Sequence, residues 1–250
     1  MDFSVRKPTH VLAFLFLLGT FALFIIFPLV SVFSPVTIPT IYSDSMSPLQ
    51  KVSIEITLLF LQFVFVFFGF IFVPIIWYKV VNKLSLKEIF ERIRLTRKGI
   101  DMALLWGFIT VIVAFGVTLV IGLFYMYFTH INPDTLSNIP DLQQLFSLSS
   151  LYILVAIQPF CEEFFFRGFL LEKLQKTSGV PLAILLTSIL FGISHLSYTY
   201  AYAAFIAIFL GILFSSVVIK TKNLYSSIFA HTIINIVSLT LFVFGQSFGM

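Results

Sequence analysis

The sequence has few charged residues and almost no cysteine. Only 10% of its 250 residues are charged, whereas about a quarter are charged in an ordinary soluble domain. The single cysteine, Cys161, excludes an internal disulfide and a zinc site built from cysteines. The sequence also lacks an internal repeat and a glycine-rich phosphate loop. A water-soluble fold could not bury the apolar surface that remains, so the composition indicates a membrane protein.

Long apolar runs occupy most of the chain, and hydrophobic residues make up 59% of it. Most runs have the roughly 20 residues that cross a bilayer. They lie at about 9–33, 53–78, 102–129, 148–170, 181–197, 199–219 and 224–245. The first run is too long for a signal peptide and lacks a small-residue cleavage site, so we expect it to be retained. We therefore predict an all-α fold, a polytopic transmembrane helical bundle of about seven spans.

Lysine and arginine are distributed unevenly between the two sets of loops. Positively charged residues accumulate in short cytoplasmic loops. With the N-terminus inside, the outer segments hold only Lys51. The inner segments hold Arg6, Lys7, Lys79, Lys83, Lys87, Arg92, Arg94, Arg97, Lys98, Arg167, Lys173, Lys176, Lys220 and Lys222. This asymmetry predicts the N-terminus inside and the C-terminus outside. Because topology accounts for the net charge of +4, we expect no nucleic-acid partner.

The chain divides into a structural part and a part that carries chemistry. We expect residues 1–146 to form N-terminal transmembrane helices with an interfacial segment, and residues 147–245 to form the functional core. The interfacial segment is 82–98, where aliphatic and basic residues alternate as in a helix lying in the membrane interface. An exposed cytosolic helix is the alternative. The aliphatic residues are Leu84, Ile89, Ile93 and Leu95.

Six polar residues fall within or at the edge of the last four apolar runs. An Asp, Lys or Arg at the centre of a membrane helix costs about 2.5–3.5 kcal/mol. Such a set therefore indicates mutual pairing or a function. The residues are Glu162, Glu163, Arg167, His195, His231 and Asn235.

The helical spacing of these residues suggests how they group. Glu163 and Arg167 are four residues apart, so they share a helix face and can neutralise each other. A helix turns by about 100° per residue, so we expect Glu162 to line a separate cavity, where it suits general base catalysis. His231 and Asn235 also share a face, a geometry that suits oxyanion stabilisation or a plain interhelical polar contact.

His195 lies in the motif FGISH of the predicted span 181–197, close to the outer end of that span. Gly192, in the same motif, allows a neighbouring helix to approach closely. A histidine here can share a proton with a carboxylate, ligate a metal or serve only in packing. The motif on its own leaves these roles open.

Together, the three motifs resemble the CPBP family, the CAAX-processing and bacteriocin-processing membrane proteases also called Abi. The family pattern EExxxR, FxxxH and HxxxN is present as Glu162 to Arg167, Phe191 to His195 and His231 to Asn235. The resemblance covers about residues 147–241 and implies an intramembrane endopeptidase whose cavity opens toward the cytoplasm. It also implies roles: Glu162 and His195 activate a water, His231 and Asn235 hold the oxyanion, and Glu163 and Arg167 shape the site or bind substrate.

Metal dependence is left open by the sequence. One glutamate and two histidines could bind zinc, and members of the family are often named metalloproteases. The zinc-protease signature HExxH is absent, and we favour a water activated by Glu162 and His195 without a metal. Cysteine catalysis through Cys161 and serine catalysis through Ser194 are disfavoured. Neither position is required by the resemblance or points toward the other site residues.

The expected partners are the lipid bilayer and a membrane-associated peptide or protein. The substrate is a prenylated CAAX-type C-terminus or a leader peptide, and the oligomeric state is left open. We expect a multi-pass protein in the cell membrane of a prokaryote. Two other classes compete: a non-catalytic bacteriocin-immunity or peptide-binding protein, and a proton-coupled transporter, which also uses intramembrane Glu and His.

Overall fold

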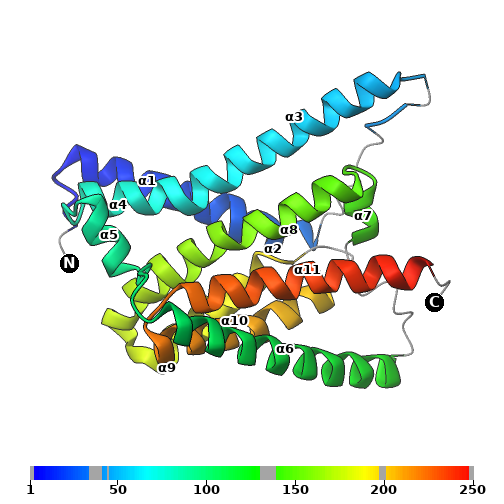
Figure 1. Cartoon of the computed structure of the whole chain (residues 1–250). Coiled ribbons are helices and arrows are strands. Elements are labelled where there is room, and N and C mark those ends of the chain that lie inside the picture. The colour runs from blue at the N-terminus through cyan, green and yellow to red at the C-terminus, as the bar shows by residue number, and fades with distance from the viewer. Residues whose placement is uncertain (1–2, 34–40, 44, 130–138, 197–200, 248–250) are drawn as a thin grey trace.

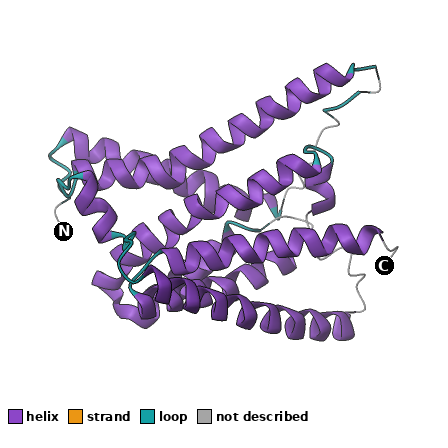
Figure 2. Ribbon diagram, in the orientation of Figure 1, coloured by secondary structure: helices purple, strands orange, loops and turns teal. Residues whose placement is uncertain are grey.

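The computed structural model describes residues 3–33, 41–43, 45–129, 139–196 and 201–247. Within these ranges every regular element is a helix, as Figure 2 shows. Six helices are long and apolar enough to cross a membrane: Pro8–Ser31, Pro48–Val80, Ile100–Phe128, Leu148–Ile193, Tyr202–Thr221 and Tyr225–Ser247. The prediction of an all-α, polytopic transmembrane bundle is confirmed.

The first two passes are each interrupted by a π-helical turn. The first consists of α1 (Pro8–Phe21), η1 (Ala22–Ile26) and α2 (Phe27–Ser31), and the second of α3 (Pro48–Phe67), η2 (Phe68–Phe72) and α4 (Val73–Val80). Pro28 and Pro74 follow directly on these turns. A proline ring clashes with the carbonyl four residues earlier, and a wider turn before it relieves the clash. Phe24 and Phe70 bring the two turns together, with ring centroids 4.3 Å apart.

The inner segment after the second pass contains one short helix, α5 (Leu86–Arg92). It begins at a capping box in which Ser85 and Glu88 satisfy each other's backbone N–H groups. Ile89 and Ile93 are completely buried and pack into the main core. The apolar side of the segment 82–98 therefore contacts protein, and its position at the membrane interface stays a prediction.

The remaining elements are α6 (Ile100–Thr129), α7 (Ile139–Gln143), α8 (Leu148–Glu163), η4 (Phe164–Leu170), α9 (Leu171–Ile193), α10 (Ala201–Thr221) and α11 (Tyr225–Ser247). The predicted spans 148–170 and 181–197 lie in one continuous helical element, Leu148–Ile193. It bends at Gly179, whose φ of +75° is readily adopted only by glycine. After the bend the chain returns alongside α10 (Figure 1). Seven predicted spans thus correspond to six long helices, one of them folded back on itself.

The segment after the bend, 180–193, is short for a membrane span. At 1.5 Å per residue it extends about 21 Å, against about 30 Å for the hydrocarbon core. His195 follows its end and is only half-buried. The helix therefore ends earlier than the predicted span 181–197. Because the segment 180–193 is short, His195 stays within the bundle.

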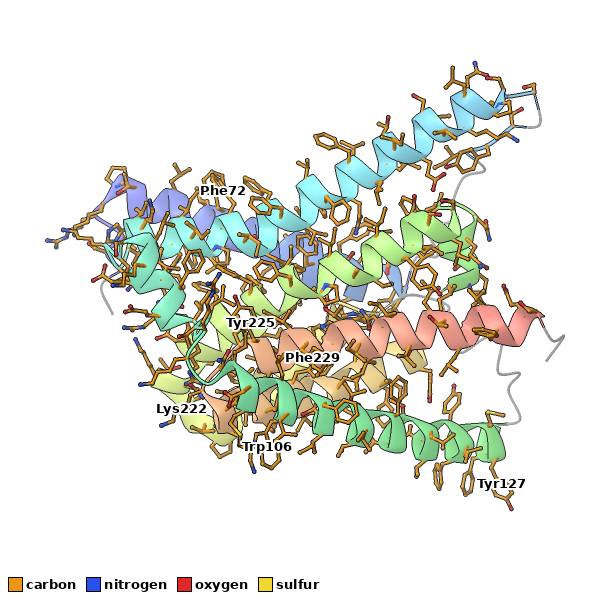
Figure 3. All side chains as sticks on the ribbon, in the orientation of Figure 1. Phe72, Trp106, Tyr127, Lys222, Tyr225 and Phe229 are labelled. Carbon is orange, nitrogen blue, oxygen red and sulfur yellow. The ribbon has the colours of Figure 1, made fainter. Side chains whose placement is uncertain are left out.

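The two ends of the bundle differ in charge. The N- and C-termini lie at opposite ends, as an odd number of passes requires (Figure 1). Trp106 and Lys222 lie toward the same end as the N-terminus, and Tyr127 lies at the other (Figure 3). The ammonium group of Lys220 lies 3.6 Å above the Trp106 ring at the basic end. Arg167, assigned to an inner segment from the sequence, is instead buried in the bundle.

The core surrounds η4. Phe164, Phe165, Phe166 and Phe169 are each at most 1% exposed, so every side of this turn is covered by other helices. Phe166 contacts Phe191 of α9 at a ring distance of 5.1 Å. Because lipid tails are as apolar as these rings, the contacts stabilise the bundle through close packing rather than through removal from water. This packing fixes η4, and with it the side chain of Arg167.

Helices α9 and α10 approach most closely at Gly192, as expected from the FGISH motif. A Cβ atom at this position would overlap Ile208 and lie 2.8 Å from the backbone oxygen of Ala204, which cannot rotate away. We expect Gly192→Ala to destabilise the protein by about 1–3 kcal/mol through overpacking. The control is Gly116→Ala on α6, where a Cβ atom meets nothing within 4 Å. Equal melting temperatures of the two variants in detergent would contradict the close contact.

Candidate active site

Glu163, the last residue of α8, is the centre of a buried polar cluster. Its side chain is fully buried, and its Oε1 atom lies 2.8 Å from Nη1 of Arg167. The same oxygen lies 3.0 Å from Nδ1 of His231 on α11. The pairing expected from the four-residue spacing of Glu163 and Arg167 is therefore present. One carboxylate oxygen accepts hydrogen bonds from two helices.

Aromatic rings enclose the guanidinium group of Arg167. Its Cζ atom lies 4.1 Å from the ring centroid of Phe191 and 5.3 Å from that of Phe214. Arginine is favoured over aromatic faces, above all where both groups are desolvated. Nε and Nη2 of Arg167 have no hydrogen-bond partner among the described residues. The charge is therefore compensated by one carboxylate and by ring faces.

His231 lies between the two adjacent glutamates. Its Nδ1 atom faces Glu163, so the neutral ring carries its proton on Nδ1 and a lone pair on Nε2. Nε2 lies 3.8 Å from Oε2 of Glu162, too far for a direct hydrogen bond. The imidazole stacks on Phe214, with ring centroids 4.9 Å apart. Its two nitrogens therefore face different carboxylates in a fixed orientation.

Glu162 is also buried, with 6% of its surface exposed. Its Oε1 atom accepts a hydrogen bond of 2.7 Å from Nε2 of Gln158, one helical turn earlier. The prediction that Glu162 lines a cavity separate from Glu163 is not what the structure shows, because both carboxylates approach His231. The two side chains do leave α8 in different directions, but the imidazole reaches between them from α11.

His195 contacts the same Phe191 ring as His231. Its Nδ1 atom is 2.8 Å from the backbone oxygen of Phe191, so in the neutral ring Nδ1–H donates to that oxygen and Nε2 is free. The Phe191 ring contacts both histidines, at 4.5 Å from His195 and 5.7 Å from His231. Among the described residues no hydrogen bond or ion pair joins His195 to Glu162.

Asn235 lies one turn after His231 on α11 and is partly buried. The described part of the chain contains no hydrogen-bond partner for its side chain. Its amide group is therefore free to donate to another molecule on the helix face that it shares with His231.

The segment that contains these residues matches a known family. Residues 144–237 match the family model described as type II CAAX prenyl endopeptidase Rce1-like. We call this matched segment, which is similar to the family, the Rce1-like domain. The resemblance to the CPBP family seen in the three motifs is thereby confirmed. No curated protein and no solved structure matches the chain significantly.

The Rce1-like domain does not present a ready-made zinc site. A catalytic zinc needs three protein ligands and an open position. Among the described residues, no three His, Cys, Asp or Glu side chains converge closely enough to hold a metal ion. Glu162 and His231 approach each other, whereas no hydrogen bond or ion pair joins His195 to either of them among the described residues. The His₂Glu alternative left open by the sequence therefore has no matching geometry.

Four residues around the cluster went unrecognised in the sequence. Phe191 was identified only as the first residue of FxxxH, and Phe214 carried no signal in a chain with 33 phenylalanines. Gln158 lies four residues before Glu162. It could have been found as a polar residue within an apolar run. Gln62 is a similar polar residue in the second pass, outside the matched segment.

Proposed function

We propose that the protein is an intramembrane endopeptidase that hydrolyses a peptide bond of a membrane-associated substrate. The observation that carries the proposal is the buried pair of Glu162 and His231, with Oε2 and Nε2 3.8 Å apart, inside an Rce1-like domain. Two atoms at this separation can both contact one water at about 2.8 Å. This pair is a site for a hydrolytic water in a dry environment.

Glu162 acts as the general base. Its Oε2 atom takes a proton from the water, whose oxygen forms a bond to the carbonyl carbon of the substrate. His195 presents a free Nε2 atom because Nδ1 donates to the backbone oxygen of Phe191. We propose that this nitrogen accepts the second hydrogen of the water, while His231 in its doubly protonated form donates Nε2–H to the water oxygen. Glu162 and His195 were expected in this role from the family resemblance.

His231 and Asn235 stabilise the oxyanion that forms as the carbonyl oxygen gains charge. Asn235 has a free amide donor, and the Nε2–H of doubly protonated His231 is the second donor. Glu163 and Arg167 hold the imidazole in place. When the carbon–nitrogen bond breaks, the proton held by Glu162 passes to the amine, leaving a carboxylic acid and a free amine.

The proposed substrate is a prenylated CAAX-type C-terminus, because the matched family is described as a type II CAAX prenyl endopeptidase. In such a substrate the prenyl chain is attached to a cysteine close to the C-terminus and places it at the membrane. A leader peptide is the second substrate class. The setting of a prokaryotic cell membrane stays a prediction.

The test is cleavage of three membrane-associated peptides by purified protein in detergent, followed by mass spectrometry. One peptide ends in a prenylated CAAX sequence, the second is the same peptide without the prenyl group, and the third is a leader peptide. We expect release of the residues after the prenylated cysteine from the first peptide alone. A chelator should leave the rate unchanged, because no three-ligand site is formed. No cleavage by folded protein would favour a peptide-binding or immunity protein.

A further inference from the structure

A line of hydrogen bonds connects the second pass to Glu162. Nε2 of Gln62 on α3 donates to Oε1 of Gln158 on α8 over 3.4 Å. Nε2 of Gln158 in turn donates to Oε1 of Glu162 over 2.7 Å. Both glutamines are partly buried within long apolar helices.

The bond from Gln158 fixes the Glu162 carboxylate. It is short and charge-assisted, so it is the strong kind of hydrogen bond. With Oε1 occupied by Gln158, Oε2 is the oxygen that faces His231. Gln158 therefore fixes the direction of the proposed base.

Gln158 is held between an acceptor and a donor. An ionised carboxylate only accepts hydrogen bonds, so the NH₂ group of Gln158 faces Glu162. The oxygen of Gln158 then accepts from Gln62, which holds the amide in this orientation. Turned the other way, Gln158 would present an oxygen to a negative charge.

The position of Gln62 is itself held by contacts between α3 and α8. Oε1 of Glu55 accepts a hydrogen bond of 2.7 Å from the backbone N–H of Ser147, the N-cap of α8. Between Glu55 and Gln62, Leu59 packs into a cluster with Leu151 and Leu154 of α8. Two polar contacts and an apolar one therefore set α3 against α8.

We propose that Gln158 is a positioning residue for Glu162, and that Gln62 positions Gln158 from outside the Rce1-like domain. The inference rests on the proposed function. It assigns part of the reaction geometry to the second pass, which the matched family segment does not include. A polar contact that only holds α3 against α8 would alter the melting temperature without lowering kcat at unchanged KM.

The test compares Gln158→Leu, Gln62→Leu and the control Gln246→Leu, a lipid-facing or solvent-facing glutamine at the end of α11. We expect Gln158→Leu to lower kcat about 10- to 100-fold with KM unchanged, as for loss of a hydrogen bond to a charged group. Gln62→Leu should lower kcat about 2- to 10-fold, as for a neutral hydrogen bond. The control should match the wild type.

Two outcomes separate the inference from the proposed function. Wild-type protein that cleaves, with Gln158→Leu cleaving equally well at every pH, would overturn the inference and leave the function standing. If the wild type does not cleave, the geometry is still tested by melting temperatures of single and double variants. Additive effects of Gln62→Leu and Gln158→Leu would then overturn the link between them, whereas non-additive effects support it.

Discussion

Replacing Glu162 by glutamine should abolish peptide cleavage while the protein stays folded. Glutamine has the size of glutamate and can still accept the hydrogen bond from Gln158 through its amide oxygen. It cannot take a proton from water, however, and loss of a general base lowers the rate by about 10²- to 10⁴-fold. The measurement is kcat on the cleaved peptide, with the melting temperature recorded for the same preparation.

The matched control for this substitution is Glu91→Gln on α5. Glu91 is exposed, and its side chain forms no hydrogen bond or ion pair within the described residues. This variant should cleave at the wild-type rate. Cleavage by Glu162→Gln within a few fold of the control would show that another group removes the proton. The proposed mechanism would then be wrong even if the protein is a protease.

The sequence predicts contacts within one helix better than contacts between helices. The pairing of Glu163 with Arg167 follows from a spacing of four residues, and the structure contains it. The same rotation of the helix predicts that Glu162 points away from Glu163, whereas the structure brings both carboxylates near His231. His231 is 68 residues further along the chain than Glu163, and helical periodicity carries no information about a ring that inserts from α11.

The number and length of the passes are likewise predicted only in part, because they depend on contacts between helices. Hydropathy finds the apolar runs, but Leu148–Ile193 is continuous except at Gly179. The bend depends on one glycine, and the short segment after it depends on packing against α10. In the same way, the apolar residues Ile89 and Ile93 were expected in the interface. They are buried because α5 lies against the core, which composition does not reveal.

The buried Glu163–Arg167 pair should show opposite effects in single and double substitutions. Removing one partner of a buried ion pair leaves an uncompensated charge and costs about 3–5 kcal/mol, whereas apolar replacement of both is often neutral. We therefore expect Glu163→Leu and Arg167→Leu each to be strongly destabilised. Arg167→Leu should be the worse, because it leaves two carboxylates together, while in Glu163→Leu the guanidinium still feels the charge of Glu162.

The double variant Glu163→Leu/Arg167→Leu should recover most of the stability but not the activity, because His231 then loses the acceptor of its Nδ1–H. Melting temperatures in detergent and kcat on the cleaved peptide separate the two effects. The matched control is Lys176→Leu, which removes the exposed lysine of the Glu172–Lys176 pair of the same i,i+4 spacing and should cost at most about 1 kcal/mol. A double variant as unstable as Arg167→Leu would mean that the ion pair is needed for folding. Full activity in a stable double variant would mean that Glu163 does not orient His231.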